Sequence, residues 1–525
     1  MNRKEFLKYG AGSFVVPSMF NGLGIAKRAN SWINSLSSAI VDTDKVLVLV
    51  RLDGGNDGLN TVIPLDQYGR LTMAREKVII PENKVLRLDG LDQVGLHPAM
   101  GKMRDLYNEG KLKIIRSVGY PNPNYSHFRS TDIWMTASDS DEIIVSGWAG
   151  RYLQNEFPNF PVDFPNEDMP DPLSLEIGSF LSLAFQGPTN AMGMSISDPS
   201  DFYELIGGGI GEVPNTPAGE KLAHVRLIKR QSNAYGQVVK DAYESVNSQG
   251  EYPDTFLGEQ LKIVSRLIAG GLKTRIYMVN IGGFDTHDRQ VDPADHTRGF
   301  HAELLREVSD AIAAFMEDLR FQGTDKRVVG MTFSEFGRRI ISNFSDGTDH
   351  GAAAPMFVFG HEIEGGMLGE NPFIPLNATP ADNLPMQYDF RSVYATMLQD
   401  WFCLPSDEVQ LVMRNDFPIL PLIANSDCVS TSTRDQYRNA GQTIISAYPN
   451  PFTERTTISF QSDGGQCLVQ VFNAHGQLVA TPAHGAYAMG EHQLDWDSET
   501  LPAGHYHLRL QNGLLQQVRP VLKVR

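Results

Sequence analysis

Short runs rich in β-branched and aromatic residues alternate with longer helical stretches between Lys45 and Ile423. The runs are KVLVLVRL, KLKIIRSV, TRIYMVNI, KRVVGMTF and APMFVFG. Strands that alternate with helices predict a mostly parallel sheet covered on both faces. From Pro217 to Gly270 the apolar residues recur at helical spacing, which predicts two long inserted helices. We therefore expect a doubly wound α/β domain over residues 45–423.

The composition changes after Ala424, where Ser, Thr, Asn and Asp predominate. This change predicts a linker over residues 424–445. Short alternating strands separated by Gly and Pro turns then continue to the last residue. Residues 446–525 are therefore expected to form a small all-β sandwich.

Charge and cysteine content exclude several classes of protein. The net charge of −17 argues against nucleic acid or an anionic membrane surface as a partner. Three cysteines in 525 residues predict neither a disulfide framework nor a cysteine-based metal site. No segment after the N-terminal region is apolar for long enough to span a bilayer.

The first 30 residues have the layout of an export signal. Arg3, Lys4 and Lys8 precede a moderately apolar stretch that ends at Lys27. The segment RKEFLK resembles the twin-arginine export motif, although Lys4 stands where the second arginine belongs. Export is therefore expected, by either the general or the twin-arginine route.

Acids and histidines cluster at the ends of the predicted strands. Asp53, Asp285 with His287, and Glu335 follow three of the strands, and His350 precedes a fourth. Parallel strands end at one edge of a sheet, so Asp53, Asp285 and Glu335 are expected to meet there. Crowded carboxylates repel one another unless a cation lies between them, and imidazoles favour zinc, manganese or iron over calcium. The alternative is a set of helix caps and turn formers.

Five blocks, taken together and in order, resemble a known bacterial family. They are LVRLDGGNDGLNTVIPL, GGFDTHDRQ, TFSEFGRRI, GTDHGAAAPMFVFG and DFRSVYATMLQDWF. The family has no known function, is described as sulfatase-like or twin-arginine-signal, and belongs to the alkaline phosphatase-like superfamily. The resemblance covers about Lys45 to Pro421. It implies the superfamily's doubly wound sheet and hydrolysis of phosphate or sulfate esters with one or two divalent metal ions, zinc or manganese.

The resemblance also implies roles for single residues. Asp53 resembles the superfamily's first metal ligand, which closes the first strand. Asp285 and His287 resemble an Asp and a His that share one metal, and His350 resembles a further histidine ligand. Glu335 stands where the superfamily has an Asp-His pair, so it is a metal-ligand candidate that departs from the pattern.

The attacking group is expected at the start of a helix, as in the superfamily's hydrolases. The segment YSHFRSTDIW lies in the matching place and offers Ser126 first, with Ser130 and Thr131 behind it. Arg129 and Arg338 are candidates for bidentate binding of the phosphate or sulfate, with surface salt bridges as the alternative. The segment CLPSD has Asp where the formylglycine motif needs Arg and lies too late in the chain, so formylglycine chemistry is excluded.

The C-terminal segment has a resemblance of its own. AYPNPFTERTTISF, VFNAHGQLV and LPAGHYHLRLQNG resemble the C-terminal sorting domain of the type IX secretion system, over residues 446–525. This resemblance implies the type IX machinery as a partner. It also implies export through the periplasm to the cell surface or beyond.

Two functions follow from these patterns. The first is a secreted or surface metal-dependent hydrolase of phosphate or sulfate esters. The second is a non-catalytic surface protein that uses the same fold to bind a glycan or a protein. His97 and His127 are interpreted as structural histidines.

Overall fold

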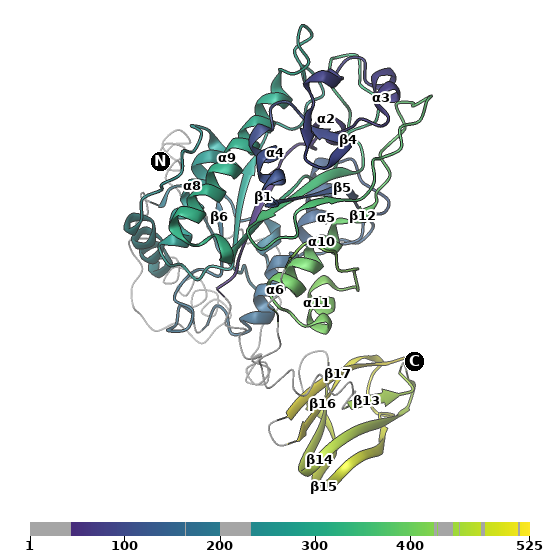
Figure 1. Ribbon diagram of the computed structural model, residues 1–525. Helices are drawn as coiled ribbons and strands as arrows, with labels where there is room; N and C mark the ends of the chain where they lie inside the picture. Colours follow the sequence, from purple (N-terminus) through teal and green to yellow (C-terminus); the bar gives the residue numbers. More distant parts are fainter. Residues whose placement is uncertain are drawn as a thin grey trace, which may run out of the picture. The chain divides into compact units, whose positions relative to one another are not determined.

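The computed structural model describes residues 44–162, 164–199, 233–424, 428, 445–450, 452–473, 478–512 and 515–524. The chain divides into two compact units that separate between Cys428 and Val429 (Figure 1). The expected export signal and most of the expected linker lie outside the described residues. Among the described helices, none has the length and apolar character needed to cross a membrane.

The first unit is built on a nine-stranded sheet. Its strands are β1 (Val46–Leu52), β5 (Leu112–Gly119), β6 (Ser174–Ile177), β7 (Met194–Ile196), β8 (Ile276–Ile281), β9 (Val328–Phe333), β10 (Ala354–Gly360), β11 (Gly366–Leu368) and β12 (Tyr388–Asp389). The order is β11-β5-β10-β9-β1-β8-β6-β7, with β12 also paired to β5. In the described sheet only β10 runs antiparallel to its neighbours. The predicted mostly parallel sheet is confirmed.

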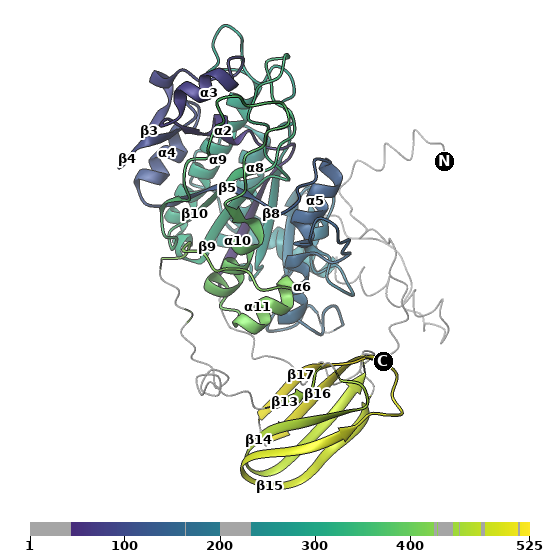
Figure 2. The ribbon, with the colours of Figure 1, turned by 90° about the vertical axis from the view of Figure 1, so that its right-hand side faces the viewer.

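Helices cover both faces of this sheet (Figures 1 and 2). One face carries α4 (Gly101–Asn108), α8 (Phe256–Ala269) and α9 (Phe300–Gln322), and the other carries α5 (His127–Thr136), α6 (Trp148–Glu156), α10 (Phe390–Thr396) and α11 (Ser406–Met413). Strand β1 explains the two layers, because its side chains alternate between the faces. Val48 and Val50 belong to one apolar core, and Leu47 and Leu49 belong to the other.

The predicted inserted helices are present in part. Residues 233–245 are helical, and α8 follows them. The N-cap of α8 is Thr255, whose side chain accepts a hydrogen bond from Gly258 N. A small sheet of order β2-β4-β3 lies beside the short helices; these elements are β2 (Val62–Pro64), β3 (Leu86–Leu88), β4 (Leu91–Leu96), α2 (Gly58–Thr61) and α3 (Tyr68–Ala74).

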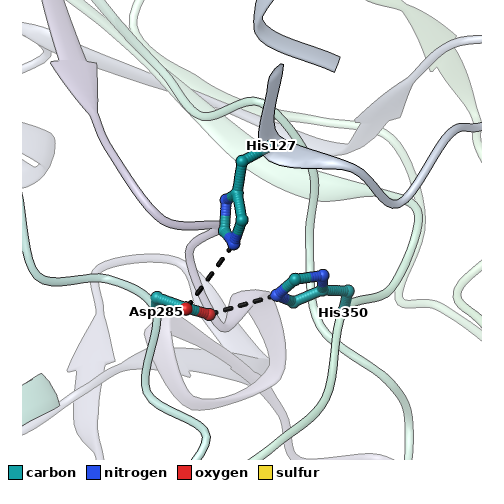
Figure 3. Close-up of side chains that lie close together, drawn as sticks. All are labelled: His127, Asp285 and His350. Atoms are coloured by element: carbon teal, nitrogen blue, oxygen red, sulfur yellow. Dashed lines mark hydrogen bonds and ion pairs between the residues drawn. The ribbon is translucent and has the colours of Figure 1, made fainter. Parts of the chain in front are cut away.

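The direction of β10 brings distant segments to one edge of the main sheet. Strands β1, β5, β8 and β9 end at this edge, whereas β10 begins there because it runs the opposite way. His127 starts α5 after β5, Asp285 follows β8, and His350 precedes β10. These three side chains therefore lie close together although they are far apart in the sequence (Figure 3).

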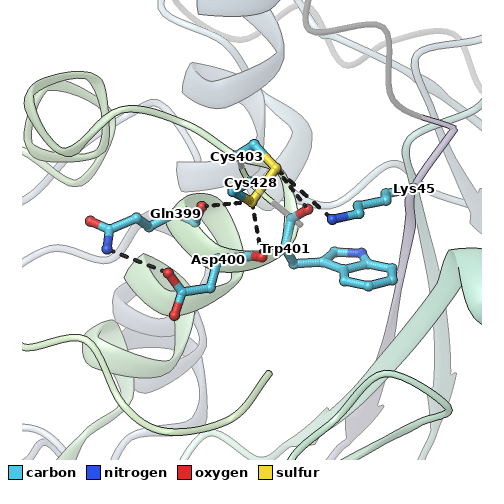
Figure 4. The surroundings of a disulfide bond; sticks show 6 residues. All are labelled: Lys45, Gln399, Asp400, Trp401, Cys403 and Cys428. Atoms are coloured by element: carbon cyan, nitrogen blue, oxygen red, sulfur yellow. Dashed lines mark hydrogen bonds between the residues drawn. A yellow bond between two sulfur atoms is a disulfide. The ribbon is translucent and has the colours of Figure 1, made fainter. Parts of the chain in front are cut away.

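A disulfide joins Cys403 to Cys428, which the cysteine count did not predict (Figure 4). Cys403 follows the π-helical turn η6 (Met397–Trp401). The indole Nε1 of Trp401 donates a 3.1 Å hydrogen bond to Val46 O, and Lys45 Nζ lies 4.8 Å from the Trp401 ring centroid. The start of β1 therefore lies beside the disulfide to Cys428, the last described residue of this unit. Sequence could not pair two cysteines 25 residues apart, but the bond fits an exported protein.

Removing the disulfide should lower the stability of the α/β unit. We expect the Cys403→Ser, Cys428→Ser double variant to lose roughly 2–4 kcal/mol, because the crosslink restricts the unfolded chain. Thermal unfolding measures the loss. Reductant should lower the melting temperature of the wild type and leave that of the double variant unchanged; equal melting temperatures without reductant would contradict the expectation.

The second unit is a small antiparallel β domain. Its strands are β13 (Ile445–Tyr448), β14 (Arg455–Asn473), β15 (Leu478–Asp497), β16 (Gly504–Asn512) and β17 (Leu515–Lys523). They pair in the order β13-β14-β16-β17, and β15 pairs with β14. Phe460, Val469, Trp496 and Leu508 are buried in a core of its own. The predicted all-β domain at the C-terminal end is confirmed.

Candidate metal centre

Two histidines face the carboxylate of Asp285 at the edge where the strands end. Asp285 Oδ1 lies 3.1 Å from Nε2 of both His287 and His350, and these two nitrogens are 2.9 Å apart. Asp285 Oδ2 lies 3.5 Å from Nε2 of a third histidine, His127. Figure 3 shows His127 and His350 pointing at Asp285 from two sides. Four side chains thus direct their nitrogen or oxygen atoms at one point.

In each of the three histidines, Nδ1 lies within hydrogen-bonding distance of an oxygen that can only accept a hydrogen bond. These pairs are His127 Nδ1 with Glu335 Oε1 at 2.9 Å, His287 Nδ1 with Asp349 Oδ1 at 2.9 Å, and His350 Nδ1 with Tyr125 O at 2.8 Å. An acceptor at Nδ1 keeps the proton there, so the Nε2 lone pair is available. Metal-binding histidines have this arrangement.

The donor set fits a metal ion. Around a tetrahedral ion with bonds of about 2.0–2.1 Å, neighbouring donor atoms are ~3.3 Å apart. The three atoms of Asp285, His287 and His350 are 2.9–3.1 Å apart. Two imidazole lone pairs and a carboxylate oxygen repel one another at this separation unless a cation lies between them. Nitrogen and carboxylate donors together suit zinc, manganese or iron.

Arg338 holds this centre together from inside the protein. Its guanidinium is buried and donates to Asp285 Oδ1 at 2.7 Å. Its other hydrogen bonds go to the carbonyls of Gly54 at 2.5 Å, Gly55 at 2.7 Å, Thr348 at 2.8 Å and Phe284 at 2.9 Å. Burial raises the pKa of Asp285, but the hydrogen bond and the positive charge of Arg338 act against burial, and this pKa lies below its usual range. Arg338 faces inward, unlike the anion clamp expected for it.

A pocket of about 380 Å³ opens beside the cluster, lined by Arg51, Asp53, Gly54, His127, Phe128, Thr131, Asp132, Asp285 and Glu335. Gly54 has a φ of 121°, and a Cβ there would lie 2.2 Å from Asp285 N. Glycine is therefore required where the segment after β1 passes the segment after β8. Asp53 pairs with Arg51, and burial raises the pKa of Asp53 to about 6 although Arg51 opposes the shift.

The five predicted metal ligands all lie at this edge, in different surroundings. Asp285, His287 and His350 form the cluster itself. Asp53 is on the pocket wall and is paired with Arg51. Glu335 is buried, and its Oε1 accepts hydrogen bonds from Gly54 N at 2.9 Å and from His127. Glu335 therefore contacts His127 and the backbone after β1, and its role as a metal ligand stays a prediction.

The predicted hydroxyl and arginine candidates lie mostly outside the pocket. Ser126 is exposed at the N-cap of α5, and Ser130 is buried with its hydroxyl 2.9 Å from that of Tyr120. Thr131 alone among the three lines the pocket. Arg129 donates to the carbonyls of the loop after α5, at 3.0 Å for Asp139.

Two residues of the site escaped the sequence analysis. His127 was interpreted as structural, although it follows a strand of the parallel sheet as Asp285 does. Its place at the start of a helix after that strand is a signal that could have found it. Arg51 lies inside the apolar run of β1, two residues before Asp53, so the two side chains share a face.

Family models match two parts of the chain. A protein family of unknown function, DUF1501, matches residues 232–410, and the secretion system C-terminal sorting domain matches residues 446–523. No curated protein matches the sequence.

Solved structures resemble the chain only distantly. The PsFucS1 sulfatase from Pseudoalteromonas sp. is 10% identical over 89% of this chain and 86% of that chain, with a TM-score of 0.32. A protein of the alkaline phosphatase superfamily from Vibrio parahaemolyticus is 8% identical over 92% and 83%, with a TM-score of 0.30. PorZ, a surface component of the type IX secretion system of Porphyromonas gingivalis, is 15% identical over 20% of this chain and 14% of that chain, with a TM-score of 0.13. The chain thus joins an α/β unit that contains the DUF1501 match to a type IX sorting domain, which directs it to the cell surface or the extracellular space.

Proposed function

We propose that this protein is an exported metal-dependent hydrolase of phosphate or sulfate esters. One observation carries the proposal: three imidazoles, each with Nδ1 facing an oxygen acceptor, direct Nε2 at the Asp285 carboxylate beside an open pocket. Asp285, His287 and His350 would hold the ion, with His127 beside them. The ion would polarise the ester and offset the negative charge that develops in the reaction.

The protein's own groups keep these donors ready. Asp349, Glu335 and the Tyr125 carbonyl fix the orientation of the histidines, and burial lowers the pKa of His350, which favours its neutral, metal-binding form. Arg338 keeps Asp285 ionised. The resemblance of the five sequence blocks to a sulfatase-like family supports ester hydrolysis as the reaction.

Metal removal and restoration test the proposal. The purified full-length chain is expected to contain about one or two divalent ions and to hydrolyse an aryl phosphate or an aryl sulfate. Treatment with a chelator should abolish turnover, and zinc or manganese should restore it. A chain that takes up no divalent ion after supplementation would overturn the proposal.

The second candidate, a non-catalytic surface protein, is favoured by the exposed position of Ser126 outside the pocket. Such a protein would bind metal but hydrolyse neither ester. The same experiment therefore separates the two candidates.

Thr131 is the hydroxyl that we propose as the attacking group in place of Ser126. It lines the pocket, and its Oγ1 accepts a 3.4 Å hydrogen bond from Arg51. Thr131→Val should lower kcat by several orders of magnitude with the metal retained, whereas Ser126→Ala should lower it far less. Steady-state kinetics and metal analysis of both variants distinguish the two hydroxyls. A larger loss of kcat in Ser126→Ala than in Thr131→Val would return the role to Ser126.

The sorting domain should be separable from the α/β unit, which has its own core. Deletion of residues 446–525 is expected to leave a folded α/β unit that accumulates in the periplasm. Cell fractionation and surface labelling measure the distribution. Normal amounts of the truncated chain at the surface would contradict a sorting role for the tail.

A further inference from the structure

An ester with a phosphate or sulfate group carries negative charge, yet acids dominate this pocket. Four of the lining residues are carboxylates: Asp53, Asp132, Asp285 and Glu335. An anion that enters such a pocket is repelled unless positive charge, from a metal ion or from a basic side chain, faces it. Arg51 is the one arginine or lysine among the lining residues.

The two arginines expected to bind the anion, Arg129 and Arg338, donate hydrogen bonds to oxygens of the protein instead. Arg338 is buried and donates hydrogen bonds to Asp285 and to four backbone carbonyls. Arg129 donates to carbonyls of the loop after α5 and does not line the pocket. Arg338 therefore has no free edge for a ligand, and Arg129 lies outside the pocket.

Arg51 does have such an edge. Its Nε pairs with Asp53, and its Nη2 makes only a long hydrogen bond of 3.4 Å, to Thr131. Within the described part of the chain, its Nη1 makes no hydrogen bond. The Arg51 side chain is 23% exposed. It is therefore partly accessible from the pocket while its ion pair with Asp53 keeps it in the pocket wall. The edge that carries both Nη groups matches two oxygens of a tetrahedral anion.

On the basis of the function proposed above, we propose that Arg51 binds the anionic phosphate or sulfate group of the substrate. The ion pair with Asp53 holds the guanidinium at the pocket wall, and the Nη1–Nη2 edge binds two oxygens of the anion. Thr131 gives up its long bond to Nη2 when the anion arrives. This leaves its hydroxyl next to the bound group.

Anion binding by the full-length, metal-supplemented protein tests Arg51. Inorganic phosphate and inorganic sulfate are the probes, and calorimetry measures their affinity. Arg51→Gln is expected to weaken binding at least 10-fold with the metal content unchanged, because Arg51 makes no contact with the clustered donor atoms. Arg51→Lys, which keeps the charge but not the fork, should bind with intermediate affinity. Arg104→Gln is the matched control, since Arg104 also pairs with an aspartate, Asp105, but outside the pocket.

The outcomes separate this proposal from the proposed function. Anion binding that depends on Arg51 without turnover of any ester supports the role of Arg51 and counts against hydrolysis. Ester turnover with equal anion affinity and KM in wild type and Arg51→Gln overturns the role of Arg51 and leaves hydrolysis standing. A wild-type protein that binds neither anion overturns the role of Arg51 as well.

Discussion

Replacing Asp285 with Asn is expected to empty the metal centre and abolish ester hydrolysis. Asn keeps the shape of the side chain but removes the charge that faces Nε2 of His287 and His350. Loss of a group behind a metal ligand already weakens metal binding by about 10–100-fold, so loss of the shared carboxylate should weaken it by more than about 100-fold. Metal analysis after dialysis and kinetics on an aryl ester measure the two losses.

Asp288→Asn is the matched control for this variant. Asp288 lies three residues further along the same segment, is exposed and pairs with Arg289. Its replacement should change neither metal content nor turnover. Circular dichroism and thermal unfolding should show that both variants are folded. An Asp285→Asn protein that keeps wild-type metal content would contradict the assignment of this centre.

The sequence predicted the frame of this centre because backbone direction follows from the alternation of strands and helices. Parallel strands end at one edge, so Asp285, which follows β8, and Glu335, which follows β9, had to lie at the same edge. His350 joins them from the start of β10, which reverses direction. The sequence showed that His350 precedes a strand, but the reversal that brings it to this edge could not be inferred from it.

Side-chain contacts were beyond the reach of the pattern. In the sequence, Glu335 and Asp285 look alike, since each is an acid that follows a strand. In the structure, Glu335 is buried against His127, whereas Asp285 Oδ1 faces His287 and His350. Which of two acids faces the histidines with two oxygens and which packs behind one of them depends on a few side-chain torsion angles. Periodicity carries no information about these angles.

Arg338 shows the same limit for a charged residue. An arginine in a polar segment is expected at the surface, and anion binding is a natural role for it there. Its burial depends on five acceptors contributed by three separate segments, around Gly54, Asp285 and Thr348. No local pattern encodes such a meeting.

Replacing Arg338 with Met should destabilise the α/β unit strongly. The substitution keeps the length of the side chain but leaves four carbonyls and the Asp285 carboxylate without their donor. Each buried carbonyl left without its donor costs about 1–3 kcal/mol, so a loss of at least that size is expected. Denaturant unfolding measures the loss. Arg339→Met is the control, since Arg339 is less buried and its side chain donates a single hydrogen bond, to Ala381 O.

The same variant should shift the pH dependence of metal binding. In the wild type, Arg338 helps to hold the pKa of Asp285 below its usual range, so the carboxylate stays ionised as the pH falls. Without Arg338 that pKa rises, and protons compete with the metal from a higher pH. Metal titrations across the acidic range should therefore show binding lost at a higher pH in Arg338→Met than in wild type, and to a lesser extent in Arg338→Lys, which keeps a charge but loses the planar fork. Identical profiles in all three proteins would limit Arg338 to holding the backbone in place.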